Sequence, residues 1–205
     1  MRDHTDDIAA SLQEHLILTG LTLAIGLVIA LPLGVACHRW KRLYPAVLGV
    51  AGVLYTVPSL ALFAFLLPFT GLSRTTALIP LVLYTLLILV RNVVAGLESV
   101  PAEVREAAEG MGLSPTRRLL RIELPLAVPA IVAGIRITTV TTIGLVTITA
   151  LIGQGGLGSL VYDGLLRDFR TPLVVGTALT VVLATLADLG LAGVQRVLTP
   201  WARGR

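Results

Sequence analysis

A chain of 205 residues that is 55% hydrophobic and only 14% charged has the composition of a membrane protein, because soluble domains carry roughly 25% charged residues. The mean hydropathy of +0.88 points the same way. At roughly 20 residues a span, this length holds about five membrane helices and leaves no room for a folded soluble domain. One cysteine excludes a disulfide framework. The net charge of +4 is explained better by basic loops at a lipid membrane than by binding of nucleic acid.

Apolar stretches in chain order predict five spans. We expect helices rather than strands, because a backbone in hydrocarbon must satisfy its own hydrogen bonds within each segment. The third stretch reaches spanning length only when residues 93–97 are included. The prediction is an all-α, polytopic integral membrane protein in which residues 1–205 form one transmembrane domain. The predicted spans cover residues 16–37, 46–69, 77–97, 126–152 and 173–194.

Basic residues predict the orientation of these spans, because short cytoplasmic loops hold an excess of arginine and lysine. Eleven of the 16 basic residues fall after the first span, between the third and fourth, and after the fifth. We therefore expect a multi-pass protein of the inner or plasma membrane, with its N-terminus outside and its C-terminus in the cytoplasm. The residues assigned to the cytoplasmic side are Arg39, Lys41, Arg42, Arg91, Arg105, Arg117, Arg118, Arg121, Arg196, Arg203 and Arg205.

The long cytoplasmic loop, residues 98–125, is too polar to lie in lipid. Pro101 suits a first helical turn, where a missing N–H costs little. Gly112 is expected to help end that helix. Ser114–Pro115 starts a second helix, and we expect Leu124–Pro125 to end it before the fourth span.

The clearest motif of the chain lies in this loop. It comprises Glu106, Ala107, Ala108, Gly112, Ile122, Leu124 and Pro125. A polar loop of this size can be no more than a solvated connection, but these residues match E-A-A-x3-G-x9-I-x-L-P at every position. That pattern is the EAA signature of ABC importer permeases. The chain therefore resembles the membrane-spanning subunit of a binding-protein-dependent ABC importer.

Four further segments indicate which group of ABC importer permeases the chain resembles most. They are residues 56–62 (TVPSLAL), 90–92 (VRN), 133–136 (AGIR) and 150–158 (ALIGQGGLG). Within the superfamily they are most similar to permeases for osmoprotectants such as glycine betaine, carnitine and choline. Methionine and phosphonate importers share the signature and a similar glycine-rich stretch, so methionine or another small solute stays open as cargo. A membrane scaffold without transport is the alternative of a different class, and the complete signature argues against it.

The resemblance implies a type I permease fold, like that of methionine importers, and a mechanical role for the loop. In the family this loop forms a coupling helix that docks into a cytoplasmic ATPase, where Glu106 would meet basic residues. Ala107 and Ala108 would allow close approach, Gly112 would turn the chain, and Leu124–Pro125 would fix the loop to the fourth span. The implied partners are a dimer of cytoplasmic ABC ATPases, a second permease subunit, either a copy or a related chain, and an extracytoplasmic substrate-binding protein.

Catalytic and cofactor motifs are not expected in this chain. It contains no G-x4-G-K-[ST] phosphate loop, so ATP and Mg²⁺ would be bound by the partner ATPase. Residues 153–158 satisfy G-x-G-x-x-G, but no β-α-β unit adjoins them, and we expect an outer turn or re-entrant segment instead. His4, His15 and His38 are scattered, which predicts neither a metal site nor a catalytic one.

Polar residues within the spans give two further predictions. Arg136 and Asp188 lie equally far from the outer ends of antiparallel helices, roughly 24 Å deep, which predicts an ion pair. The alternative is that each side chain reaches the inner interface separately. Candidates for lining a translocation path are Thr138, Thr142, Tyr55 and Tyr84. Helix packing is the more common use of such residues.

Overall fold

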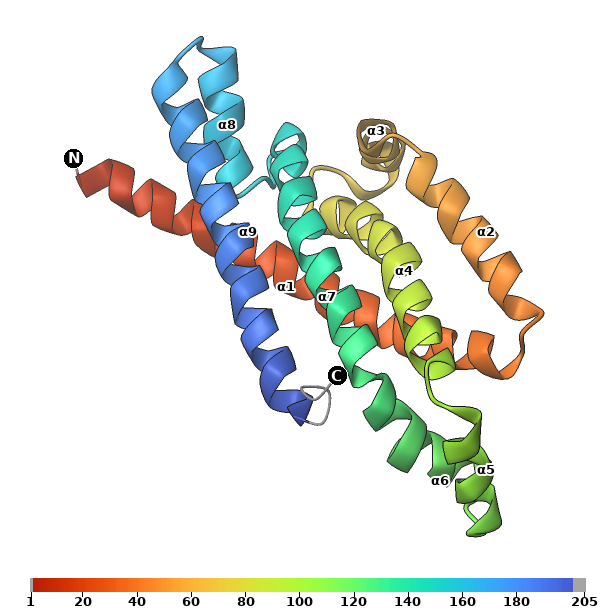
Figure 1. Cartoon of the computed structure of the whole chain (residues 1–205). Helices are drawn as coiled ribbons and strands as arrows, with labels where there is room; N and C mark the ends of the chain where they lie inside the picture. Colours follow the sequence, from red (N-terminus) through yellow and green to blue (C-terminus); the bar gives the residue numbers. More distant parts are fainter. Residues whose placement is uncertain (1, 201–205) are drawn as a thin grey trace.

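The computed structural model describes the backbone of residues 2–200 and the side chains of residues 6–200, and nearly all of this part is helical. Long helices lie beside one another, and short helices lie toward the ends of the molecule (Figure 1). Arg203 and Arg205, which the orientation prediction uses, lie outside the described residues. The elements are α1 (Arg2–Arg39), α2 (Leu43–Thr56), α3 (Ser59–Thr70), α4 (Arg74–Glu98), α5 (Ala102–Gly110), α6 (Pro115–Arg118), the π turn η1 (Leu119–Glu123), α7 (Leu124–Val146), the 3-10 turn η2 (Thr147–Ile152), α8 (Leu157–Leu166) and α9 (Arg170–Leu198).

Within the described residues, four helical stretches are long and apolar enough to cross a membrane, and the bent pair α2 and α3 makes a fifth if it counts as one span. The predicted all-helical membrane fold is therefore confirmed. The first helix is longer than predicted, since α1 already begins at Arg2. The four stretches are Asp6–Arg39, Arg74–Glu98, Pro115–Ile152 and Arg170–Leu198.

The second predicted span, residues 46–69, is not a single helix. It consists of α2 and α3, which are bent by 91°. Pro58 explains the break, because proline lacks an N–H and disfavours helical backbone at the residue before it. Val57 is accordingly extended, with φ −64° and ψ 128°. Its carbonyl accepts a hydrogen bond of 2.7 Å from the Tyr84 hydroxyl of α4, so a neighbouring helix supplies a partner at the break.

A second difference concerns the end of the cytoplasmic loop. Leu124–Pro125 does not end the second loop helix, because α6 continues through η1 and α7 as one stretch, Pro115–Ile152. A proline inside a helix needs room against the carbonyl four residues earlier and leaves that carbonyl without its N–H partner. The wider π turn Leu119–Glu123 precedes Pro125 by one residue, and there the Leu124 N–H donates to the Leu119 carbonyl five residues earlier. The loop and the fourth span therefore form one continuous helical rod.

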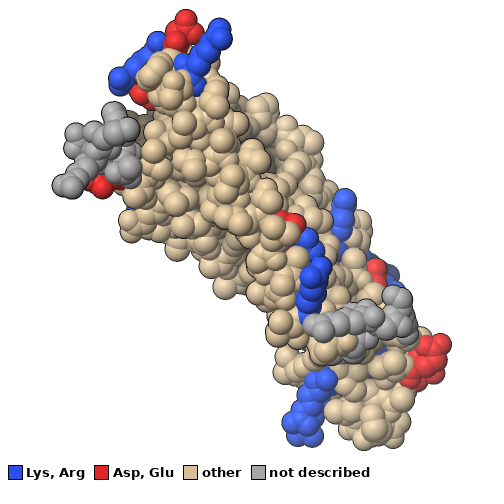
Figure 2. All heavy atoms as spheres, turned by 60° about the vertical axis from the view of Figure 1, so that its left-hand side comes forward, with Lys and Arg blue, Asp and Glu red and all other residues tan. Residues whose placement is uncertain are grey.

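The core of the chain is built around α4, which packs against α1, α2 and α7 (Figure 1). In contrast, α9 packs on α7 and α8 and leaves most of its apolar surface exposed, including Val181 and Leu186. Charged side chains gather mainly toward the two ends of the molecule, with a largely uncharged belt between them (Figure 2). This distribution suits a protein whose middle lies in lipid.

In the glycine-rich segment, residues 153–156 form a turn between η2 and α8, and residues 157–158 begin α8. Gly156, with φ +49°, lies so close to the backbone of His15 that a side chain there would collide. Its N–H donates a hydrogen bond of 3.2 Å to the Glu14 carboxylate. The turn is therefore fastened to α1, and its glycine is required by close backbone approach.

Candidate functional site

The signature residues lie on a helical hairpin that projects beyond the long helices at one end of the molecule (Figure 1). One arm is α5 and the other is α6 with η1. Gly112, with φ +74°, makes the turn that ends α5. Its N–H donates to the Glu109 carbonyl at 2.8 Å, and the Leu113 N–H donates to the Ala108 carbonyl at 3.2 Å. Glycine adopts this left-handed conformation most readily, so the signature glycine fixes where the arm turns.

The seven signature residues occupy two different places. Glu106 and Ala107 are exposed on α5, whereas Ala108 is fully buried. Met111, at the tip, is 71% exposed. A charged glutamate beside a small alanine and a flexible methionine makes a surface that another protein can approach closely. Gly112 makes the turn after α5, and the other three signature residues lie half-buried at the root of the hairpin: Ile122, Leu124 and Pro125.

A charged cluster ties the hairpin together. Arg118 forms an ion pair with Glu109, and its Nε donates to Oε1 of Glu123 at 2.7 Å. The Glu123 side chain is only 4% exposed, and His38 at the end of α1 lies 3.9 Å from its Oε2. A buried carboxylate is stable only with such partners. These four residues, here called the hairpin cluster, connect α5 to α1 and to the start of α7.

The sequence prediction missed the hairpin cluster, although two signals point to it. Glu109 and Arg118 carry opposite charges on either side of the glycine turn, where the arms fold back on each other. Glu123 occupies the variable position between Ile122 and Leu124 of the signature. It stands at the start of an apolar span, where a carboxylate needs a partner.

The membrane cluster consists of Arg136, Asp188 and Gln195. Arg136 of α7 and Asp188 of α9 form a bidentate ion pair, with Nε to Oδ1 and Nη2 to Oδ2 both at 2.9 Å. Arg136 Nη1 also donates to Gln195 Oε1 at 3.1 Å, and Gln195 Nε2 donates to the Pro129 carbonyl at 3.1 Å. The structure thus brings together the two charges singled out in the sequence. Gln195 was missed, although it follows Asp188 by two helical turns and lies on the same face.

The four candidate path residues do not form one group. Thr138 and Thr142 are buried in the helix packing, and the Thr138 hydroxyl donates to the Gly134 carbonyl of its own helix at 2.8 Å. Tyr55 and Tyr84 meet edge to face, with ring centroids 5.7 Å apart, beside the break between α2 and α3. In this structure Tyr84 therefore supports the bent helix pair, and the two threonines support helix packing.

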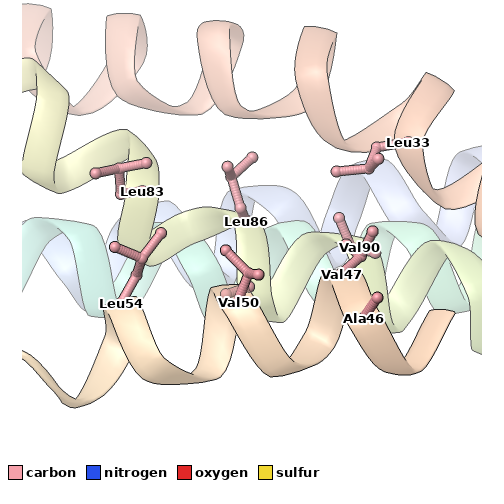
Figure 3. A pocket seen from close by; sticks show the side chains of 9 residues that line it. Leu33, Ala46, Val47, Val50, Leu54, Leu83, Leu86 and Val90 are labelled. Atoms are coloured by element: carbon pink, nitrogen blue, oxygen red, sulfur yellow. The ribbon is translucent and has the colours of Figure 1, made fainter. Parts of the chain in front are cut away.

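One hollow on the surface is entirely apolar. Side chains of α1, α2 and α4 point into it, among them Leu33, Val50 and Leu86 (Figure 3). A hollow without polar lining has nothing to orient a charged solute.

Comparison with known proteins assigns the class. Residues 17–201 match the family described as binding-protein-dependent transport system inner membrane component. The chain belongs to this family, whose members are permease subunits of transporters. The predicted family is therefore confirmed.

Particular relatives are similar along almost the whole chain. The osmoprotectant import permease protein OsmW of Salmonella typhimurium is 38% identical over 205 residues, covering 98% of this chain and 95% of that protein. The choline transport system permease protein OpuBB of Bacillus subtilis is 36% identical over 188 residues, covering 91% and 86%. A chain of the inward-facing MetNI methionine ABC transporter matches with a TM-score of 0.87 and 24% identity, covering 97% of this chain and 99% of that chain. This last likeness confirms the predicted methionine-importer-like fold.

Proposed function

We propose that this chain is the permease subunit of an ATP-driven importer for quaternary-ammonium osmoprotectants, with glycine betaine, carnitine and choline as the cargo class. The observation that carries the proposal is the similarity, over more than nine-tenths of the chain, to permeases named for osmoprotectant and choline transport. The exposed signature surface on α5 supports it, because that surface suits docking of another protein.

The working complex contains more than this chain. Five spans are too few to enclose a path that opens alternately to the two sides, so a second permease, a copy or a relative, completes it. The exposed apolar surface of α9 leaves ample room for such a neighbour. Two cytoplasmic ATPases supply the energy, and they bind the ATP and Mg²⁺. An extracytoplasmic binding protein delivers the cargo. In this arrangement the N-terminus is outside and the hairpin is in the cytoplasm.

The hairpin transmits the ATPase movement. Closure of the ATPases on ATP pushes α5 at Glu106 and Ala107. Because α6, η1 and α7 form one continuous rod, the push reaches the fourth span directly. The hairpin cluster keeps the two arms from moving independently, since Arg118 holds Glu109 and Glu123 at once.

High-affinity recognition of the cargo belongs to the binding protein. Quaternary ammonium groups are usually held against aromatic rings. This chain is only 5% aromatic. Its path therefore holds cargo weakly and briefly, which is sufficient for a subunit that receives solute already selected.

Co-purification and uptake test the proposal together. The tagged chain is expressed from its native operon, purified, and reconstituted in vesicles with its ATPase and binding protein. We expect the ATPase to co-purify and labelled glycine betaine to accumulate with ATP, with excess choline or carnitine competing and methionine not competing. Absence of a co-purified ATPase would overturn the importer role. ATP-driven uptake of methionine in place of glycine betaine would overturn the cargo class alone.

A further inference from the structure

Two charged side chains stand on the surface of α7 and α9 within long apolar spans. Arg136 is 30% exposed and Asp188 is 35% exposed, although they pair with each other. Contact of such charges with lipid hydrocarbon is strongly unfavourable, and ionisable residues in spans usually face a protein interior or a water-filled cavity. The exposed side of this pair must therefore be covered by water or by protein.

A groove lies between the two helices on this side. It comprises two hollows of about 460 and 380 Å³, which share Val140 and Asp188. Thr141 of α7 lines the first hollow, and Thr185 of α9 lines the second. We name the two hollows together the α7–α9 groove. Each is large enough for a small solute.

The ion pair presents both signs of charge to this groove. Each oxygen of Asp188 accepts one hydrogen bond from Arg136 and keeps a second acceptor position. Arg136 has five N–H donors, and its bonds to Asp188 and Gln195 leave some of them free to donate. A solute with both a cationic and an anionic group can meet both side chains, whereas a solute of one sign must compete with the partner already present. The remaining groove residues offer apolar contact for methyl groups: Ala133, Ile137, Val140, Val181 and Ala184.

We propose that the α7–α9 groove is a wall of the cargo path, and that the Arg136–Asp188 pair is a transient contact for the zwitterions of the cargo class, which carry a methylated ammonium and a carboxylate. This inference rests on the proposed function. Asp188 meets the ammonium and Arg136 meets the carboxylate. A pair that already satisfies itself holds such a cargo weakly, which suits a path that the solute must leave again.

A neighbouring hollow on α9 provides the matched comparison. It is lined only by apolar side chains, from Ile8, Leu12, Leu157, Leu179, Val182, Leu183 and Leu186. Leu186 follows Thr185 directly, so the two positions lie at nearly the same depth in α9. They differ in surroundings, because Leu186 lines the apolar hollow and Thr185 lines the charged groove.

Cysteine accessibility tests the inference. Cys37 is the one cysteine of the sequence and is buried, so Cys37→Ala gives a thiol-free background. Thr141→Cys, Thr185→Cys and Leu186→Cys are introduced one at a time into the complex with its ATPase, held in lipid nanodiscs. A charged, water-soluble thiol reagent is then added with glycine betaine or with sucrose at equal osmolarity. We expect the two groove thiols to react and to be slowed several-fold by glycine betaine but not by sucrose, while the Leu186→Cys thiol stays unreactive.

The role of the charges is tested by Arg136→Gln combined with Asp188→Asn, which removes both charges and leaves neither unpaired. We expect the groove thiols of this variant to react but to lose protection by glycine betaine. Unreactive groove thiols, reaction without protection, or protection that survives loss of both charges would each overturn the inference. Uptake by the Cys37→Ala complex, reconstituted in sealed vesicles with its binding protein, tests the proposed function separately from the inference. Normal uptake without protection overturns the inference alone, whereas no uptake of any quaternary ammonium overturns the proposed function as well.

Discussion

The hairpin cluster and the membrane cluster both centre on an arginine bound to carboxylate, yet they do different things. Arg118 reaches partners only 5 and 9 residues away, so it stiffens one local hairpin. Arg136 reaches partners 52 and 59 residues away, so it joins two helices from distant parts of the chain. Burial differs too, since Glu123 is 4% exposed and Asp188 is 35% exposed. The hairpin cluster, whose central carboxylate is buried, is therefore suited to transmitting a movement. The membrane cluster is partly exposed and is suited to contact with a solute or another protein.

Removing the buried carboxylate should have the largest effect. We expect Glu123→Ala to lower the free energy of unfolding by about 1–3 kcal/mol, because the Nε of Arg118 loses its buried acceptor and only the exposed Glu109 remains as its carboxylate partner. Thermal unfolding of the purified permease, followed by size-exclusion chromatography, measures this. Glu123→Gln is the matched control, since it keeps the shape and an oxygen for Arg118, and it should lose much less. Wild-type stability of Glu123→Ala would show that the hairpin cluster is not a structural joint.

The membrane cluster should show strong coupling in a double-mutant cycle. We expect Arg136→Ala and Asp188→Ala each to lower the yield of folded, inserted protein, because each leaves the other charge unpaired within a span. The yield of the double variant should be higher than the yield expected if the two single losses simply added, because neither charge is then left unpaired. Fluorescence-detected size exclusion of all four proteins measures the yields. Additive losses would mean that the two residues act independently despite their contact.

Gln195→Leu should have a smaller effect within the same cluster. It removes the bonds to Arg136 and to the Pro129 carbonyl. At roughly 0.6 kcal/mol for each hydrogen bond between membrane helices, we expect a loss of about 1 kcal/mol. Val194→Leu, at an exposed neighbouring position, is the control and should leave the unfolding midpoint unchanged. A loss as large as that of Asp188→Ala would make Gln195 an equal member of the pair.

The outer end of the hairpin cluster should matter least. Glu109 is 62% exposed, and exposed ion pairs contribute at most about 1 kcal/mol. We therefore expect Glu109→Gln to unfold close to the wild-type midpoint and to retain most uptake activity, as measured in vesicles, because the amide oxygen can still accept a hydrogen bond from Arg118 and keep the two arms joined. A large loss of uptake with normal stability would show that the charge of Glu109 is itself needed to pass the movement from α5 to Arg118.

Sequence reasoning succeeded where one residue or one short pattern decides the outcome. Hydropathy predicted the long helices, and Gly112 with Ser114–Pro115 correctly placed the turn between the hairpin arms. The sequence predictions were wrong at two prolines, because a proline can either end a helix or be tolerated within it. Pro58 breaks a helix, whereas Pro125 lies in a continuous helix just after a π turn. The hairpin cluster and Gln195 were missed because their partners meet only once the arms and helices are packed.

The most direct test of the whole account compares two acidic residues of the same helix. Glu106 and Glu103 are both exposed on α5, but only Glu106 belongs to the signature. ATP-driven uptake of labelled glycine betaine is measured in vesicles containing equal amounts of inserted Glu106→Lys or Glu103→Lys permease, together with ATP hydrolysis. We expect Glu106→Lys to abolish uptake and Glu103→Lys to retain most of it. Normal uptake by Glu106→Lys would contradict the coupling role of the hairpin.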